Sequence, residues 1–152
     1  MSKERPTSKL APKEELDVLL QEFSNMKAYA DAIRQQLELA SNIIADMLLS
    51  KASLMEIKSR SGNGETLIHI GGGNYIRAQL QNVDSVIVGI GSGVSVEKSL
   101  DDAISNIDSR IKLGQEQATT LQNNFTQISA RLGQLQGRID QLYAQLEAAG
   151  QA

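Results

Sequence analysis

Three closely spaced glycines, Gly89, Gly91 and Gly93, are the residues of this sequence that most resemble a nucleotide-binding loop. Dinucleotide loops have the spacing Gly-x-Gly-x-x-Gly before a helix, and ATP loops end in Gly-Lys-Ser or Gly-Lys-Thr. Here the spacing is Gly-x-Gly-x-Gly, no long helix follows directly, and neither Gly-Lys ending occurs. Because tight hairpin turns need glycine for positive φ, we interpret these glycines as turns.

The other residues that could do chemistry also favour structural roles. His69 is the only histidine and the chain has no cysteine, which removes thiol catalysis and Cys-ligated zinc. Asp101 and Asp102 suit the positive end of a helix dipole better than a cation site. Tyr75 and Arg77 could suggest RNA binding, but on an acidic chain we interpret them as residues of a strand face. We therefore expect no catalytic residue, metal ligand or cofactor, and no enzyme.

Composition narrows the class of protein further. The chain has 152 residues, close to one average domain, so a large multidomain enzyme is excluded. Aromatic residues make up only 3%, which favours narrow apolar seams along an elongated chain over a compact core. The net charge of −3 argues against a nucleic-acid partner, since phosphate backbones attract clustered Lys and Arg. No apolar run suits a membrane span or a signal peptide, so we expect a cytoplasmic protein without a membrane partner.

Two long stretches repeat apolar residues at alternating spacings of three and four, the pattern of a left-handed coiled coil. We predict helices over residues 12–60 and 99–147, flanked by a flexible tail at 1–11 and a tail at 148–152. The seam of the first helix is Leu16, Leu19, Phe23, Met26, Ala30, Ile33, Leu37, Ala40, Ile44, Met47 and Leu54, with Lys51 and Lys58 at two polar positions. The seam of the second is Leu100, Ile104, Ile107, Ile111, Ala118, Leu121, Phe125, Ile128, Leu132, Leu135, Ile139, Leu142 and Leu146, with a gap at Gly114.

The apolar set of the first helix widens towards its end. Ile43, Leu48, Leu49, Met55 and Ile57 are all outside the seam. A widened stripe indicates that this part of the helix packs against something larger than one other helix.

Between the helices, residues 61–98 change to a period of 2 and contain glycine-rich turn signals. We predict two tandem β-hairpins, so the fold class is α+β: a long antiparallel coiled-coil hairpin with two β-hairpins inserted between its helices. A two-stranded hairpin is marginal alone and exposes unpaired N–H and C=O groups, so these hairpins should join strands of other subunits in an obligate oligomer. The residues assigned to subunit assembly are Leu67, Ile68, Ile70, Tyr75, Ile76, Val86, Ile87, Val88, Ile90, Val94 and Val96.

Excess apolar residues also occur at the ends of the helices far from the insert. A two-helix seam does not account for Leu20 or Tyr143, which antiparallel pairing brings to the same end. Unpartnered apolar surface there suggests a binding site, although a trimerising coiled-coil end would give the same pattern. The candidate binding residues are Leu16, Leu19, Leu20, Phe23, Ile139, Leu142, Tyr143 and Leu146.

The order of parts over residues 16–146 resembles the α class of the prefoldin family. The segments LIHIGGGNYIRAQL, from Leu67 to Leu80, and VIVGIGSGVSVEKSLDDA, from Val86 to Ala103, carry the resemblance. Two hairpins between equal helices are a specific feature, because β-class subunits carry one. His69 departs from the family, which often has proline at that position.

The resemblance implies an archaeal ATP-independent chaperone, assembled as a hexamer of two α and four β subunits. It also implies that the β-hairpins contribute to an oligomeric β-barrel body, from which the coiled coils protrude. It implies capture of unfolded polypeptides at the coiled-coil tips and their delivery to a group II chaperonin. A structural coiled-coil adaptor or filament subunit without client binding remains the alternative from the residues alone. A holdase assay separates the two.

Overall fold

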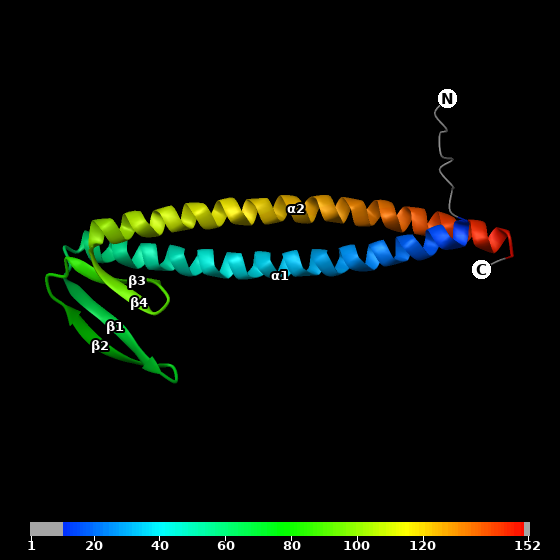
Figure 1. The fold of residues 1–152 in the computed structure, drawn as a ribbon. Helices are drawn as coiled ribbons and strands as arrows, with labels where there is room; N and C mark the ends of the chain where they lie inside the picture. The colour runs from blue at the N-terminus through cyan, green and yellow to red at the C-terminus, as the bar shows by residue number, and fades with distance from the viewer. Residues whose placement is uncertain (1–10, 151–152) are drawn as a thin grey trace, which may run out of the picture. The chain divides into compact units, whose positions relative to one another are not determined.

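The computed structural model describes residues 11–150 and contains two long helices, with two β-hairpins between them in the order of the chain (Figure 1). The elements are α1 (Pro12–Ser59), β1 (Gly64–Gly71), β2 (Asn74–Leu80), β3 (Ser85–Gly91), β4 (Val94–Ser99) and α2 (Leu100–Ala148). The predicted α+β fold class is confirmed. The predicted tails fall largely on residues 1–10 and 151–152, which are outside the described residues. None of the described helices is long and apolar enough to cross a membrane.

The contacts divide the chain into two compact units, to which both helices contribute. We call residues 1–38 with 119–152 the terminal unit, and residues 39–118 the hairpin unit. Every predicted seam position of α1 and α2 is buried or half-buried except Lys58, which is exposed. The 3-4 spacing therefore identified the packed face of both helices correctly.

In the terminal unit, the helices pack through a leucine-rich seam. Leu16, Ile139, Leu142 and Leu146 form a buried cluster, and Leu19 with Phe23 packs against it. Leu142 is the most deeply buried of these, with 1% of its surface exposed. Burial of large aliphatic side chains is the main force that holds two such helices together.

In the hairpin unit, the seam continues with different residues. Met47, Ile107 and Ile111 form the buried cluster, and Ile44 and Leu54 pack against it. Next to this cluster Gly114 faces α1, where an added methyl group would lie 3.2 Å from Cγ1 of Ile44. The gap in the predicted heptad is thus a position where Ile44 of α1 occupies the space of the missing side chain.

Two interhelical ion pairs flank this second seam. Lys51 Nζ lies 2.5 Å from Asp108 Oδ1, and Lys58 Nζ lies 2.5 Å from Asp101 Oδ1. The two lysines at predicted seam positions therefore reach carboxylates on α2. Because these side chains are partly exposed, each pair contributes about 1 kcal/mol at most.

The two β-hairpins are separate two-stranded antiparallel sheets, β1–β2 and β3–β4. Their turns have the same construction, because Gly71-Gly72-Gly73 and Gly91-Ser92-Gly93 all have positive φ. A register irregularity precedes each turn, between His69 and Gly71 and between Gly89 and Gly91. These turns confirm the predicted turn role of Gly91 and Gly93, whereas Gly89 lies within β3, where it pairs with Ser95 and has no positive φ.

A hydrogen-bonded junction joins the helices to the hairpins. The end of α1 is closed by bonds from Gly62 N–H to the Ile57 carbonyl (2.9 Å) and from Ser61 N–H to the Lys58 carbonyl (3.0 Å). This is a Schellman arrangement, which satisfies carbonyls that the helix leaves free. The segment between the hairpins binds back to it, since Val83 N–H donates to the Gly62 carbonyl at 3.0 Å.

The start of α2 is fixed by its cap. Ser99 Oγ accepts a bond from Asp102 N–H at 3.1 Å, as expected for a serine before the first turn. Leu100 N–H donates to the Asp84 carbonyl at 3.1 Å, which ties the helix start to the linker between the hairpins. Ser99 is therefore the N-cap residue of α2.

Candidate protein-interaction surfaces

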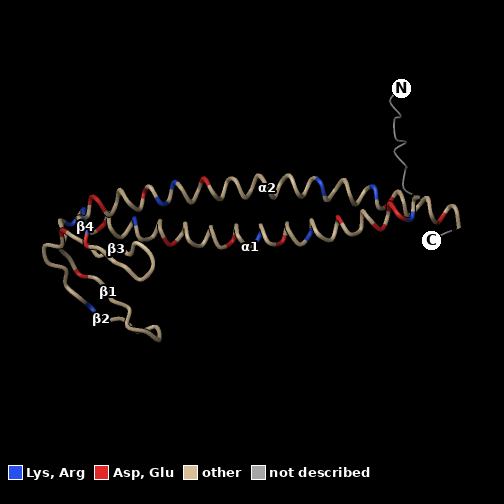
Figure 2. Tube along the Cα trace, viewed as in Figure 1, with Lys and Arg blue, Asp and Glu red and all other residues tan. Residues whose placement is uncertain are grey.

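The first candidate surface is made by the exposed apolar residues of the hairpins, which carry few charges (Figure 2). In the described chain each hairpin has only one strand-to-strand ladder, so both of its outer edges lack a neighbouring strand. Eight of the predicted assembly residues are exposed, and three are half-buried. The exposed ones are Leu67, Ile68, Ile70, Tyr75, Ile76, Ile87, Ile90 and Val94; the half-buried ones are Val86, Val88 and Val96.

The β1–β2 hairpin has two faces of different chemistry. On one face the register places Ile68 opposite Ile76, with no charged residue beside them. We call this the uncharged face; Thr66 and Ala78 are also a pair on it. Ile68 and Ile76 are 47% and 49% exposed, so about half of their surface is open to solvent in the described chain.

The other face of the β1–β2 hairpin is polar and aromatic. Arg77 forms an ion pair with Glu65 at 3.3 Å, and the rings of His69 and Tyr75 are 5.0 Å apart, tilted by 57°. Tyr75 and Arg77 therefore lie on a strand face, as the sequence predicted, and His69 packs against an aromatic neighbour.

The β3–β4 hairpin, in contrast, is partly covered. Val86 and Val88 line a hollow of about 190 Å³ together with Leu54 and Ile107 of the helices. The opposite face exposes Ile87, whose side chain is 79% accessible and lies across from Glu97. The β3–β4 hairpin thus packs on its own helices, whereas the β1–β2 hairpin leaves the apolar pair Ile68 and Ile76 about half exposed.

The second candidate surface is at the end of the terminal unit. Six of the eight predicted binding residues belong to the seam, because Leu16, Leu19, Phe23, Ile139, Leu142 and Leu146 make or border its buried cluster. Only Leu20 and Tyr143 are exposed, at 38% and 44%. The structure brings all eight residues to one end of the helix pair. Their binding role stays a prediction.

Ion pairs identify the side of the helix pair on which Leu20 and Tyr143 lie. Arg138 donates from Nε to Glu15 Oε1 at 2.8 Å and from Nη2 to Oε2 at 3.0 Å. On α1, Glu15 immediately precedes the seam residue Leu16, and Leu20 follows Leu16 by four positions. On α2, Arg138 and Tyr143 have the same two spacings from the seam residue Ile139. In an antiparallel pair these two kinds of position line opposite flanks. One flank is therefore charged, and the other carries Leu20 and Tyr143.

A second fork extends the charged flank by one heptad. Arg131 donates to Glu22 Oε1 from Nη2 at 2.8 Å and from Nε at 3.2 Å. We call the side with these two Arg–Glu pairs the charged flank, and the side with Leu20 and Tyr143 the apolar flank.

Sequence reasoning left a third group of exposed apolar residues out of the candidate site residues. Leu39, Ile43, Leu48, Leu49 and Met55 are all exposed on α1 within the hairpin unit, between 47% and 67%. The signal was present, since these residues make most of the widened stripe. The heptad alone could not tell which element covers them.

Comparison with known proteins gives a consistent result. Residues 14–145 match the family model described as Prefoldin subunit. A protein named prefoldin subunit alpha from Methanobrevibacter smithii is 32% identical over 126 residues, covering 83% of this chain and 86% of that protein. A protein of the same name from Pyrococcus horikoshii is 30% identical over 122 residues, covering 80% and 82%.

The fold also resembles that of a solved structure, filamentous PFD from Methanocaldococcus jannaschii determined by cryo-EM. The TM-score is 0.65 and the identity 20%, with 77% of this chain and 97% of that chain covered. At this identity the likeness speaks for the fold alone.

Proposed function

Because this chain belongs to the prefoldin family, we propose that it is the α subunit of an ATP-independent chaperone that captures unfolded polypeptides. In this proposal two copies assemble with four β-class subunits through the hairpins. The terminal units of the helices hold the client, and the assembly transfers it to a group II chaperonin in the cytoplasm.

The uncovered hairpins support assembly. Four strand edges and the uncharged face of the β1–β2 hairpin are open to solvent in the described chain. Exposed strand edges pair readily with other strands, and large apolar patches mark protein contacts. A partner subunit that supplies strands would pair the exposed strand edges and cover the apolar surface at the same time.

The apolar flank supports client capture. Unfolded chains expose apolar segments without a fixed sequence, so a receptor for them needs non-directional burial rather than a shaped pocket. Leu20 and Tyr143 offer such a surface, and each contributes about 1.5–3 kcal/mol at most when buried. One such contact is weak, but several tips acting on one client add up by avidity. Release then requires only a competing acceptor.

The alternative is a structural adaptor or filament subunit without client binding. Its supporting observation is that most of the predicted binding residues are already occupied in the seam. Under this alternative Leu20 and Tyr143 would be ordinary exposed residues of a coiled coil.

The experiment compares three variants of the chain assembled with a β-class subunit. Leu20→Ser with Tyr143→Ser should leave helicity and complex mass unchanged and weaken suppression of light scattering by an aggregating enzyme. Val18→Ser is the matched control, because Val18 is 54% exposed on the same helix but outside the apolar flank. Ile44→Ser should reduce helicity and assembly first, since a core cavity costs about 2–5 kcal/mol.

The expected defect of the double variant is partial, since in the proposed hexamer four of the six tips belong to partner subunits. Unchanged suppression of aggregation across several clients, at equal complex concentration, would show that the apolar flank is not the capture site. Failure of the parent complex to suppress any aggregation would favour the adaptor alternative.

A further inference from the structure

The junction between α1 and the β1–β2 hairpin contains a chemically labile pair of residues, Asn63 and Gly64. Of the eight asparagines in the sequence, Asn63 alone is followed by glycine; the others precede Met, Ile, Tyr, Val, Asn or Phe. Asparagine is thermolabile, because the backbone nitrogen of the next residue can attack its side-chain amide carbon. A glycine has no side chain to obstruct that attack. The sequence therefore makes Asn63 the most reactive asparagine of the chain.

The side chain of Asn63 also has a structural role, because it bridges two segments of the junction. Its Nδ2 donates to the Ser61 carbonyl at 2.8 Å, in the turn that closes α1. Its Oδ1 accepts from Asn82 N–H at 3.0 Å, in the linker between the hairpins. Both bonds use atoms of the amide that an attack by the Gly64 nitrogen would change.

The surroundings of this pair provide space, solvent and a positive charge. Asn63 is exposed, and a hollow of about 180 Å³ is lined by Arg60, Asn63 and Gly64. Arg60 Nη1 lies 3.3 Å from the place where a Cβ of Gly64 would be, while Glu56 Oε1 accepts from Arg60 Nε at 2.7 Å. A cation favours loss of a proton from a neighbouring nitrogen and stabilises an oxygen that gains negative charge. Arg60 is therefore placed to promote the attack.

We propose that Asn63 is a self-modification site, at which attack by the Gly64 nitrogen, promoted by Arg60, converts the asparagine and loosens the root of the β1–β2 hairpin. A bond forms between Gly64 N and Asn63 Cγ, and the Cγ–Nδ2 bond breaks. Nδ2 leaves as ammonia, which carries away the proton of the Gly64 amide. One water molecule then opens the cyclic imide, and the product is aspartate or isoaspartate. No oxidant or reductant takes part.

Either product disturbs the bridge that Asn63 makes. A carboxylate cannot donate a hydrogen bond. In place of Nδ2 it would set a second acceptor 2.8 Å from the Ser61 carbonyl, so the side chain has to leave Ser61 or Asn82. In isoaspartate the backbone runs through the former side-chain carbonyl, which lengthens the chain between Gly62 and β1.

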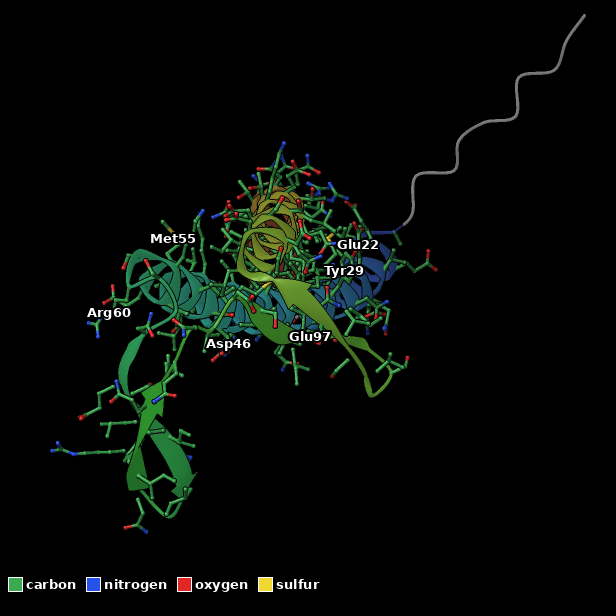
Figure 3. The ribbon with its side chains drawn as sticks, turned by 90° about the vertical axis from the view of Figure 1, so that its left-hand side faces the viewer. Glu22, Tyr29, Asp46, Met55, Arg60 and Glu97 are labelled. Carbon is green, nitrogen blue, oxygen red and sulfur yellow. The ribbon has the colours of Figure 1, made fainter. Side chains whose placement is uncertain are left out.

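The direction of the β1–β2 hairpin depends on this root, because β1 and β2 pack mainly on each other. Figure 3 shows Arg60 beside the root of the hairpin, from which β1 and β2 extend away from α1. Conversion of Asn63 should therefore misalign a hairpin that the proposed function uses for assembly. This consequence rests on the proposed function, whereas the reaction itself does not.

The reaction is tested on the complex with a β-class prefoldin subunit, incubated in mildly alkaline buffer and analysed by peptide mass spectrometry. Asn63 should convert before any other asparagine. Asn74 is the internal control, because its Nδ2 also donates to a backbone carbonyl, that of Gly71 at 3.2 Å, but a tyrosine follows it. Earlier conversion of another asparagine, or an intact Asn63 under conditions that convert it in the denatured chain, would overturn the inference.

Two variants test the part assigned to Arg60. Arg60→Gln should slow the conversion of Asn63 by up to about fivefold, the factor that one charge at about 4 Å gives in water. Arg60→Lys keeps the charge and should retain most of the rate. Equal rates for the parent and Arg60→Gln would refute promotion by Arg60.

The consequence is tested with Asn63→Asp and its control Asn74→Asp. Hydrogen exchange at Val83 N–H, which donates to the Gly62 carbonyl, reports opening of the junction. Asn63→Asp should speed this exchange about fivefold, the equivalent of one hydrogen bond, and Asn74→Asp should leave it unchanged. Unchanged exchange in both variants would refute the loosening of the root. If the parent chain forms no complex, the proposed function fails, and mass spectrometry of the chain alone still decides whether Asn63 converts first.

Discussion

Gly62 should be the least replaceable glycine of the chain, because two independent constraints act on it. Its φ is +72°, in the left-handed region that side chains disfavour. Its missing Cβ would overlap the backbone carbonyl of Val83, which belongs to the linker between the hairpins. Gly62→Ala should therefore destabilise the junction both through its own backbone and through displacement of that linker.

The magnitude follows from the two constraints. An alanine in the left-handed region costs about 1–2 kcal/mol relative to the ordinary helical conformation. Moving Val83 breaks its 3.0 Å bond to the Gly62 carbonyl, and a lost backbone hydrogen bond costs about 1 kcal/mol. The sum is about 2–3 kcal/mol. Gly73→Ala is the matched control, because Gly73 has a φ of +77° but open space around its missing Cβ, so only the first cost applies.

The assay is urea unfolding of the assembled complex, followed by circular dichroism at 222 nm. Protomer concentration is kept equal in all samples, since the stability of an oligomer depends on it. Gly62→Ala should lower the free energy of unfolding by about 1 kcal/mol more than Gly73→Ala does. Equal losses of unfolding free energy for the two variants would show that Val83 moves aside without a measurable energetic cost. That result would refute the steric part of the reasoning.

Three other predictions concern the helices. Gly133→Ala and Gly137→Ala should each raise the free energy of unfolding by up to about 1 kcal/mol, because both glycines are inside α2 with nothing near their missing Cβ. Unchanged midpoints of urea unfolding would contradict this. Arg138→Gln should cost at most about 1 kcal/mol, a loss that disappears in high salt if the fork to Glu15 is its cause. The complex should unfold below about 90 °C in a calorimetric scan. The reason is that the outer faces of the second helix are rich in Gln, Asn, Ser and Thr, whereas proteins of hyperthermophiles more often carry Lys–Glu networks there.

The helices could be predicted from the sequence because one periodic signal determines them. A coiled-coil residue is buried or exposed according to its heptad position, so the seam follows from spacing alone. The hairpins were similarly readable, since Gly71-Gly72-Gly73 and Gly91-Ser92-Gly93 supply the positive φ that such turns need. Each of these signals is local in the chain.

The constraints on Gly62 could not be predicted in the same way. Glycine commonly ends a helix, yet at the end of α1 both Ser61, at φ 52°, and Gly62, at φ 72°, have positive φ. Gly62 is glycine also because Val83, from a distant part of the chain, occupies the space of its Cβ. Only a tertiary contact reveals this, and no propensity encodes it.

The candidate binding residues illustrate the same division. Heptad spacing correctly placed all eight residues at one end of the helix pair. It could not separate the residues that are buried in the seam from the residues that remain accessible. That separation needed the side-chain exposure and the position of the Glu15–Arg138 pair, which together define the two flanks. The extra apolar residues of α1 were visible in the sequence as a widened stripe, yet only the structure shows that Ile43, Leu48, Leu49 and Met55 remain exposed.

The burial of the seam also decides how a client would be held at this end. Opening the helices to offer Leu16, Ile139, Leu142 and Leu146 would expose four buried side chains, at a cost of roughly 6–12 kcal/mol at 1.5–3 kcal/mol for each. A client that buries the same residues could at best return that amount, so an opened seam gains nothing over the closed one. The apolar flank requires no opening, and burial of its two exposed residues is a net gain. Weak flank contacts summed over several tips are therefore the more favourable way to hold an unfolded chain.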